Sequence, residues 1–326
     1  EKLAEIFGGI ETLYYRFGED HERDKLIQGA VAAASRKSRK TFEVTPSKFI
    51  DPDSLIGPIR LIKSAAEIAL MERAASLTRD AHAAAMVMAA PGRMEFEVES
   101  VLSHTFRMGG GVGPSYESIV ASGANACTLH YVKNDTEIRD GDLVLIDAGC
   151  EFLGYAADVT RTFPASGRFS EPQKRIYELV LKANIEVVEF VKPGVRFCEL
   201  QEFTIRILTE GLVELGLLEG EVDQLIEDRS YNRFYMHGVS HWLGLDVHDA
   251  GPYCENGDSI MLREGMALTI EPGIYVQADD MEAPERYRGI GIRIEDDILV
   301  TASGSRNLTA QIPKTIEEIE LSIGSR

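Results

Sequence analysis

The chain has 326 residues, and 34 lysines and arginines against 53 aspartates and glutamates give it a formal net charge of −19. This acidity argues against a nucleic-acid-binding protein, because phosphate binding requires a basic surface. No stretch reaches the ~18 uncharged apolar residues of a membrane helix, so neither nucleic acid nor a membrane is expected as a partner.

The first sixty residues are expected to form a region of their own. Their pattern predicts helices and a short extended segment. Turn-forming residues follow at Pro52, Gly57 and Pro58, and they indicate a domain boundary near residue 60.

Beyond this boundary, a group of helices and a group of short strands occur twice. Apolar residues at helical spacing predict helices, and β-branched or apolar runs bounded by Gly and Asp predict strands. The expected order is helices at 64–89 and 95–108, strands at 118–121, 143–146 and 155–160, helices at 171–191 and 198–217, and strands at 266–270 and 290–300.

Short motifs repeat along with the elements. Pro91-Gly92 ends one helix and Pro193-Gly194 ends another, and a glutamate follows five residues after each glycine. Residues 139–149 and 263–273 share the order Arg, acid, Gly, four residues, Ile, acid, any residue, Gly. Two such halves would pack as an α+β domain with an internal pseudo-twofold, in which Asp147 and Glu271 occupy equivalent positions.

Carboxylates stand at the ends of these β-type runs or within them. Asp147 follows an apolar strand and Asp158 comes eleven residues later, so neighbouring strands could turn both to one face. Glu295 alternates with Arg293, which also projects this pair to one face. A turn-forming Asp and a surface Glu–Arg pair remain the alternative interpretations.

Histidines gather in the same part of the sequence. His237, His241 and His248 fall within twelve residues, and His130 precedes Asp147. Any one of them could be an ordinary core or surface histidine. Together, four carboxylates and an imidazole form a ligand set for two cations such as Mn²⁺, Co²⁺ or Fe²⁺, and the lack of thiolates disfavours a structural zinc site. Two cations about 3.5–4 Å apart would share a water and lower its pKa towards ~7.

The motifs, taken in order, resemble the aminopeptidase P group, which are dinuclear metallopeptidases with the pita-bread fold. The resemblance runs from about residue 60 to the C-terminus. It is carried by Ser122-Gly123-Ala124-Asn125-Ala126 with His130-Tyr131, Leu145-Ile146-Asp147-Ala148-Gly149, Asp158-Val159-Thr160-Arg161-Thr162-Phe163, His237-Gly238-Val239-Ser240-His241-Trp242-Leu243-Gly244, Glu271-Pro272-Gly273 and Gly291-Ile292-Arg293-Ile294-Glu295-Asp296-Asp297.

This resemblance implies a role for each matching residue. The metal ligands would be Asp147, Asp158, His241, Glu271 and Glu295, with Asp158 and Glu295 bridging two divalent ions. Mn²⁺ is the expected metal, with Co²⁺, Fe²⁺ or Zn²⁺ as alternatives. Glu271 would also accept a proton from the attacking water. His130, His237 and His248 would act beside it in catalysis, and Tyr131 and Arg293 would bind substrate.

The implied reaction is release of the N-terminal residue from peptides with proline in second position, by attack of a metal-bridging hydroxide on the Xaa-Pro bond. A proline dipeptidase, limited to Xaa-Pro dipeptides, is the first alternative. Creatinase has the fold but does not need the full ligand set. A pita-bread protein that binds a partner without catalysis is the alternative from another class; loss of a ligand would indicate it, and all five are present.

The resemblance also bears on domains, assembly and compartment. Residues 61–326 would be the catalytic pita-bread domain, and residues 1–60 the C-terminal part of a truncated N-terminal domain. A homo-oligomer, dimer or tetramer, is implied. No leader segment is visible, and the four widely spaced cysteines without a CxxC pair predict reduced thiols, so we expect a cytoplasmic protein.

Overall fold

The computed structural model describes residues 2–324, which divide into two compact units. The smaller unit holds the residues up to Ile59 together with Ala250–Pro252, and the larger unit holds the rest. Within the described residues, no helix combines the length and the apolarity needed to cross a membrane.

The helices and strands follow the predicted order. The α-helices are α1 (Lys2–Ile6), α2 (His21–Thr41), α3 (Asp53–Leu61), α4 (Ala65–Met88), α5 (Glu95–Met108), α6 (Glu171–Phe190), α7 (Phe197–Glu214), α8 (Val222–Glu227) and α9 (Ile316–Gly324), and short 3₁₀ turns are η1 (Gly123–Cys127), η2 (Ser230–Arg233) and η3 (Glu285–Tyr287). The strands are β1 (Thr12–Tyr14), β2 (Lys48–Ile50), β3 (Gly113–Pro114), β4 (Ile119–Ser122), β5 (Leu143–Asp147), β6 (Cys150–Phe152), β7 (Tyr155–Ala156), β8 (Thr160–Pro164), β9 (Cys254–Glu255), β10 (Asp258–Ser259), β11 (Ala267–Ile270), β12 (Gly273–Val276), β13 (Ile290–Arg293), β14 (Asp296–Val300) and β15 (Ser305–Asn307).

The smaller unit contains the long helix α2, a two-stranded parallel sheet of β1 and β2, the short helix α1 and most of α3. The side chain of Asp20 caps helix α2 by accepting hydrogen bonds from two backbone amides of its first turn. Phe7, Ala30 and Ala34 form a small core, while Phe42 is 91% exposed. That residues 1–60 are the C-terminal part of a larger domain stays a prediction.

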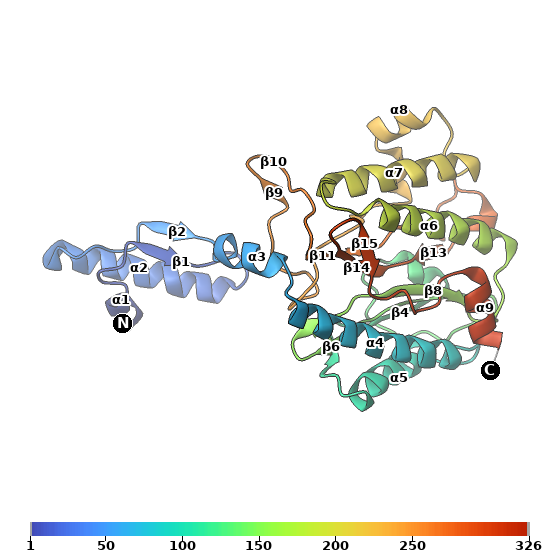
Figure 1. The fold of residues 1–326 in the computed structure, drawn as a ribbon, viewed down its shortest axis with the longest axis horizontal. Coiled ribbons are helices and arrows are strands. Elements are labelled where there is room, and N and C mark those ends of the chain that lie inside the picture. The colour runs from blue at the N-terminus through green and yellow to red at the C-terminus, as the bar shows by residue number, and fades with distance from the viewer. Residues whose placement is uncertain (1, 325–326) are drawn as a thin grey trace. The chain divides into compact units, whose positions relative to one another are not determined.

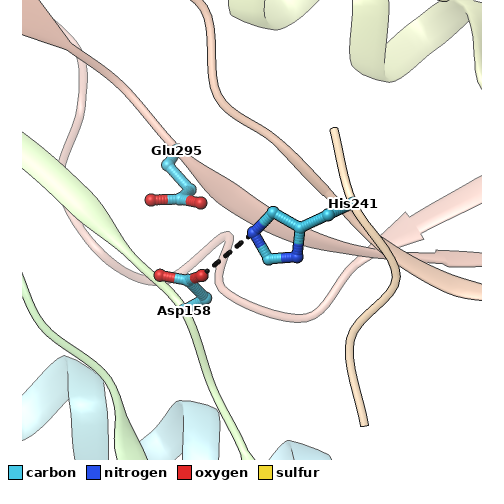
Figure 2. Close-up of side chains that lie close together, drawn as sticks. All are labelled: Asp158, His241 and Glu295. Carbon is cyan, nitrogen blue, oxygen red and sulfur yellow. Dashed lines mark ion pairs between the residues drawn. The ribbon is translucent and has the colours of Figure 1, made fainter. Parts of the chain in front are cut away.

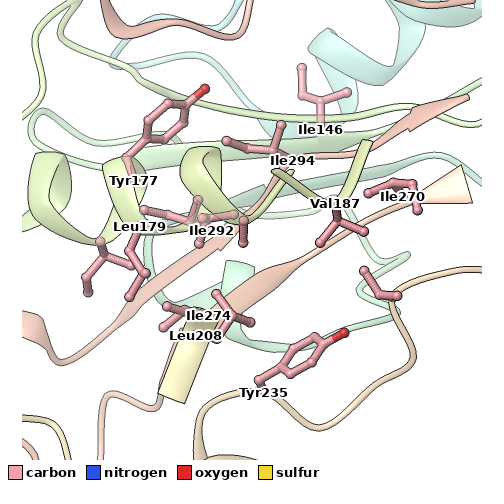
Figure 3. Packing of buried hydrophobic residues seen from close by; sticks show 14 of the residues in the cluster. Ile146, Tyr177, Leu179, Val187, Leu208, Tyr235, Ile270, Ile274, Ile292 and Ile294 are labelled. Carbon is pink, nitrogen blue, oxygen red and sulfur yellow. The ribbon is translucent and has the colours of Figure 1, made fainter. Parts of the chain in front are cut away.

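The larger unit places its strands between two pairs of helices. Helices α4 and α5 lie on one side of the strands, and α6 and α7 lie on the other (Figure 1). Figure 3 shows the packing on the α6 side, where Tyr177, Leu179 and Val187 of α6 lie among strand isoleucines such as Ile270 and Ile292. The strands that carry the predicted site are therefore buried on both faces.

The internal repeat predicted from the sequence extends to individual hydrogen bonds. The Gly92 amide donates to the Ile138 carbonyl at 2.8 Å, and the Gly194 amide donates to the Leu262 carbonyl at 3.0 Å. Both glycines have positive φ, +86° and +89°. The helix that follows each Pro-Gly pair begins with the same interaction, in which the side chain of Glu97 or Glu199 accepts from the backbone amide three residues earlier. The two halves of this unit are thus built alike.

Two predicted strands are interrupted, and each interruption contains a predicted metal ligand. The run 155–160 divides into β7 and β8 on either side of Asp158, and the run 290–300 divides into β13 and β14 on either side of Glu295. The register does not change across the second break, because β11 pairs β14 with Ile270 opposite Asp296 and β12 pairs β13 with Gly273 opposite Arg293. Glu271 and Glu295 therefore stand opposite each other.

Candidate functional site

A cavity of about 610 Å³ in the larger unit collects nearly all the predicted site residues. Its wall includes Asp147, Asp158, His241, Glu271 and Glu295 together with His130, His237, His248 and Arg293. Most of the remaining wall is formed by Tyr116, Glu117 and the apolar side chains Ile119, Leu129, Val132 and Val247. Tyr131 is not among the lining residues.

Each carboxylate comes from a strand end, so the backbone determines where it lies. Asp147 is the last residue of β5, and Asp158 precedes β8, its antiparallel neighbour. In the second half, Glu271 lies between β11 and β12, and Glu295 between β13 and β14. The four acids thus reach one cavity from both halves of the repeat.

His241 is held in the orientation of a metal ligand. Its Nδ1 lies 3.0 Å from the Trp242 carbonyl oxygen. A carbonyl can only accept, so Nδ1 carries a hydrogen, and Nε2 is left to donate to the neighbouring carboxylates or, once deprotonated, to bind a metal ion. Nε2 lies 3.3 Å from Asp158 Oδ2 and 3.6 Å from Glu271 Oε1.

Three of the predicted ligands already form a compact group. Ligand atoms of Asp158, His241 and Glu295 all lie within 4.8 Å of one another. Figure 2 shows the imidazole of His241 directed at the two carboxylates, with a dashed line marking its ion pair with Asp158. Asp158 and Glu295 are buried, and His241 is partly exposed.

Two of the carboxylates share one tyrosine hydroxyl. The Tyr116 hydroxyl lies 2.6 Å from Asp147 Oδ1 and 2.6 Å from Asp158 Oδ1, but it has only one hydrogen to donate. Burial raises the pKa of Tyr116 well above its usual range, and the charges of Asp147 and Asp158 add to this shift. The phenol therefore stays protonated, and its single hydrogen can reach only one of these two carboxylate oxygens at a time.

Burial, together with the neighbouring negative charges, raises the pKa of several acids at the site. Burial raises the pKa of Glu271 to about 7 against the opposing effect of His241 and Arg293. The pKa of Glu295 is raised well above its usual range by burial and by Asp158, and that of Asp147 is raised by burial. Burial alone lowers the pKa of His241, but Asp158 and Glu271 raise it to about 9. Such a site attracts cations.

Arg293 connects the acids to the histidines. It is only 4% exposed, and its Nη2 lies 2.6 Å from Asp147 Oδ2. Its Nη1 donates to the Tyr275 hydroxyl at 3.1 Å, and that hydroxyl lies 2.9 Å from His237 Nε2. Its Nε donates to Thr160 Oγ1, which donates to Glu295 Oε2 at 2.7 Å. Arg293 thus fixes groups on two walls of the cavity.

The donor set fits divalent metal ions. Four carboxylates and a neutral imidazole are the oxygen-rich set preferred by Mn²⁺ and similar cations. Bound cations would offset the buried negative charge that, together with burial itself, raises the pKa of Asp147, Glu271 and Glu295. His237 is different, because burial and then Arg293 lower its pKa to about 4, and its Nδ1 is committed to the Gly238 carbonyl at 2.8 Å.

Sequence reasoning missed several polar side chains at the site. Tyr116, Thr160 and Tyr275 hold the acids and His237, but hydroxyl residues in apolar strands carry no distinctive pattern. Tyr131, predicted to bind substrate, lies outside the cavity wall, and its hydroxyl donates to Glu95 Oε2 at 2.8 Å. Glu95 is fully buried and also accepts from Ser122, Asn125 and Thr136. It thereby organises the segment that carries His130.

Comparison with known proteins gives one consistent result. The family model for metallopeptidase family M24 matches residues 69–302. The Xaa-Pro aminopeptidase of Escherichia coli K12 is 46% identical over 98% of this chain and 72% of its own length. That of Haemophilus influenzae is 52% identical over 84% of this chain and 63% of its own length. The solved structure of Pseudomonas aeruginosa aminopeptidase PepP superposes with a TM-score of 0.90 at 46% identity, over 99% of this chain and 73% of that one.

Proposed function

The chain belongs to metallopeptidase family M24 and has its pita-bread α+β fold, and from this we propose that it is an Xaa-Pro aminopeptidase. It releases the N-terminal residue from peptides with proline in second position. The observation that carries the proposal is the convergence of five ligand-type side chains with three further histidines and an arginine on one cavity wall. Relatives of 46% and 52% identity that bear this activity in their names support the substrate class.

Five residues would hold the metal ions: Asp147, Asp158, His241, Glu271 and Glu295. We propose two ions, which these five side chains would hold together, and Mn²⁺ as the metal, because the set has four carboxylates and no thiolate. When bound, such ions acidify water and polarise the carbonyl of the scissile bond. Proton transfer and substrate binding are assigned to side chains of the protein.

Glu271 is the proposed proton acceptor. Its carboxylate faces two histidines of the second half, with Oε1 3.6 Å from His241 Nε2 and Oε2 3.8 Å from His237 Nδ1. A carboxylate inside the cavity, next to the attacking water, can take its proton and later deliver it to the leaving nitrogen. That delivery matters for proline, whose nitrogen carries no hydrogen in the peptide bond.

The remaining polar residues would bind and orient the substrate. His130 and His248 line the cavity. Partial desolvation there lowers the pKa of His248, so a neutral ring is available to hydrogen-bond the developing oxyanion. Arg293 and Tyr275 hold His237 in place, as their hydrogen bonds indicate. The apolar wall formed by Ile119, Val132 and Val247 offers a surface for the proline ring.

The test compares two substrates on one enzyme preparation. Hydrolysis of an Xaa-Pro-Xaa tripeptide and of the matching Xaa-Pro dipeptide is followed by mass spectrometry after chelator treatment and after Mn²⁺ is restored. Metal-dependent release of the first residue from the tripeptide is the expected result. Cleavage of the dipeptide alone would identify a proline dipeptidase, and no cleavage of either would overturn the proposal.

A further inference from the structure

A buried histidine outside the cavity contacts the segment that carries Asp147. His82, in the middle of α4, is fully buried, and its Nε2 lies 2.9 Å from the carbonyl oxygen of Ala148. The carbonyl can only accept, so Nε2 carries the hydrogen. Among the described residues, His82 Nδ1 has no hydrogen-bond partner. A buried imidazole nitrogen without a hydrogen-bond partner costs stability, and an apolar side chain at this position would avoid that cost.

A buried asparagine occupies the equivalent position in the second half. His82 and Asn184 each stand nine residues before the proline of their Pro-Gly pair. Asn184, in α6, is fully buried, and its Nδ2 donates to the carbonyls of Ile270 at 3.2 Å and Ile294 at 3.3 Å. These two carbonyls belong to the peptide bonds that lead into Glu271 and Glu295.

In the second half, Asn184 replaces a hydrogen bond that the strands cannot make. Ile294 stands opposite Pro272 in the antiparallel register, and its amide donates to the Pro272 carbonyl at 3.2 Å. The reciprocal bond is impossible, because proline has no N–H. Asn184 therefore supplies the donor for the Ile294 carbonyl, immediately beside the two glutamates.

In the first half, His82 does the same. The Ala148 amide donates to the Val159 carbonyl at 3.0 Å, but within the described chain the Ala148 carbonyl accepts from His82 instead of the Val159 amide. The two segments are pressed together here: a Cβ on Gly149 would lie 1.7 Å from the Ala157 carbonyl oxygen. His82 thus supplies the hydrogen bond that the strands do not form in the interruption between Asp147 and Asp158.

We propose that His82 and Asn184 are positioning residues for the metal centre. Each supplies the hydrogen bond missing where the strands break, and so holds the spacing of the ligands on either side, Asp147 and Asp158 in one half and Glu271 and Glu295 in the other. The two residues act through peptide groups and touch no ligand side chain. This inference rests on the metal site of the proposed function. It assigns α4 in the first half and α6 in the second half a role in holding the metal ligands at the right spacing.

The test replaces each donor by an apolar side chain and measures metal binding without substrate. His82→Leu and Asn184→Leu remove the hydrogen bonds, and His82→Gln restores an amide donor. Thr204→Val is the matched control: Thr204 is fully buried in α7, and its hydroxyl bonds only to Leu200 of its own helix, at 2.8 Å. Mn²⁺ is titrated calorimetrically into each chelator-treated protein, after circular dichroism has shown that it is folded.

We expect both leucine variants to bind Mn²⁺ about 10–100-fold more weakly, as is usual when a group that orients metal ligands is lost. His82→Gln should recover most of the affinity, and Thr204→Val should stay within about twofold of the parent. With saturating Mn²⁺, kcat on the tripeptide should remain reduced while KM changes little, because the cavity wall is untouched.

Several outcomes would overturn this inference. Leucine variants with the parent's Mn²⁺ affinity would do so, as would an equal loss in Thr204→Val. Should Asn184→Leu fail to fold, Asn184→Asp lacks the Nδ2 donor and keeps the size. Should His82→Leu fail to fold, His82→Met, which has no hydrogen to donate, gives the same contrast with His82→Gln. Because Mn²⁺ binding is measured without peptide, a parent protein that binds Mn²⁺ but cleaves nothing would refute the proposed function and leave this inference standing.

Discussion

The two halves of the larger unit share a fold but stabilise their part of the site differently. In the first half, a neutral histidine of α4 supports the strands of Asp147 and Asp158. In the second half, Asn184 of α6 belongs to a charged network. Its Oδ1 accepts from Lys314 at 2.7 Å, and Lys314 pairs with Asp296, which also pairs with Arg161 at 2.7 Å.

The difference shows which parts of a repeated fold are free to change. The turns and helix starts keep the same hydrogen bonds, because they determine the path of the backbone. The supporting side chains need only present a donor at the right place, so His and Asn serve equally well. Charge and pH should therefore affect the two halves differently, and substitutions in each half can test this.

The largest effect is expected from Glu271→Gln in the second half. The amide keeps the shape of the side chain but cannot accept a proton, so kcat for the tripeptide should fall by about 10³-fold or more while the fold is kept. Mass-spectrometric rates on both proteins, with melting curves as the control for folding, give the result. A variant that keeps more than a tenth of the parent's kcat would contradict the assignment of Glu271.

Asp296→Asn should destabilise the fold more than the replacement of His82 or Asn184 by an uncharged side chain. Asp296 and Arg161 are both fully buried, and the positive charges of Arg161 and Lys314 hold the pKa of Asp296 well below its usual range against the opposing effect of burial. Removing one partner of a buried pair leaves uncompensated charge and costs about 3–5 kcal/mol. His82→Leu, which leaves only a carbonyl without a donor, should cost about 1–3 kcal/mol.

Urea unfolding of the metal-free proteins measures both values. The comparison of the two halves fails if Asp296→Asn costs no more than His82→Leu. Arg161→Met sharpens the comparison. It should approach the cost of Asp296→Asn, because Asp296 then keeps Lys314 as its remaining cationic partner beside the hydrogen bond from Thr309.

Sequence patterns predicted most elements of this fold but not the interruptions that create the site. The run 290–300 is apolar throughout except for its acids and Arg293, so nothing in its alternation indicates a break at Glu295. Pro272 is the sequence feature that could have indicated this break. A proline in a strand cannot donate a hydrogen bond to the opposite strand, which here contains Ile294. The roles of His82 and Asn184 could not be predicted, since a polar residue in a long helix reveals its partner only when the helix is packed.

The pH dependence of stability should separate the halves. Burial lowers the pKa of His82 from 6.5 to about 4, so the unfolded chain binds a proton below pH 6.5 that the folded chain does not take up until about pH 4. Stability therefore falls as the pH drops through this window, by roughly 3 kcal/mol from this residue. The contribution of Asp296, whose folded pKa is depressed, is present above its unfolded pKa of about 3.8 and is lost only below it.

The measurement compares the parent with His82→Gln by urea unfolding between pH 7 and 4, without metal. His237 and the acids of the cavity titrate in both proteins, so the difference between the two curves reports His82. We expect the parent to lose more stability than the variant over this range. Parallel curves would mean that His82 is not a neutral buried imidazole.

The smallest effect is expected at the turns, where the halves are most alike. Gly92→Ala and Gly194→Ala place a side chain at φ values of +86° and +89°, and neither added Cβ meets an atom within 4 Å. The cost is therefore conformational strain alone, about 1 kcal/mol in each case. Gly304→Ala is the control, because that position is also open but does not have positive φ, and it should be nearly neutral. One glycine variant could lose several times more free energy of unfolding than the other. The two halves would then differ in the energetics of their backbone as well, and the contrast between them could not be attributed to His82 and Asn184 alone.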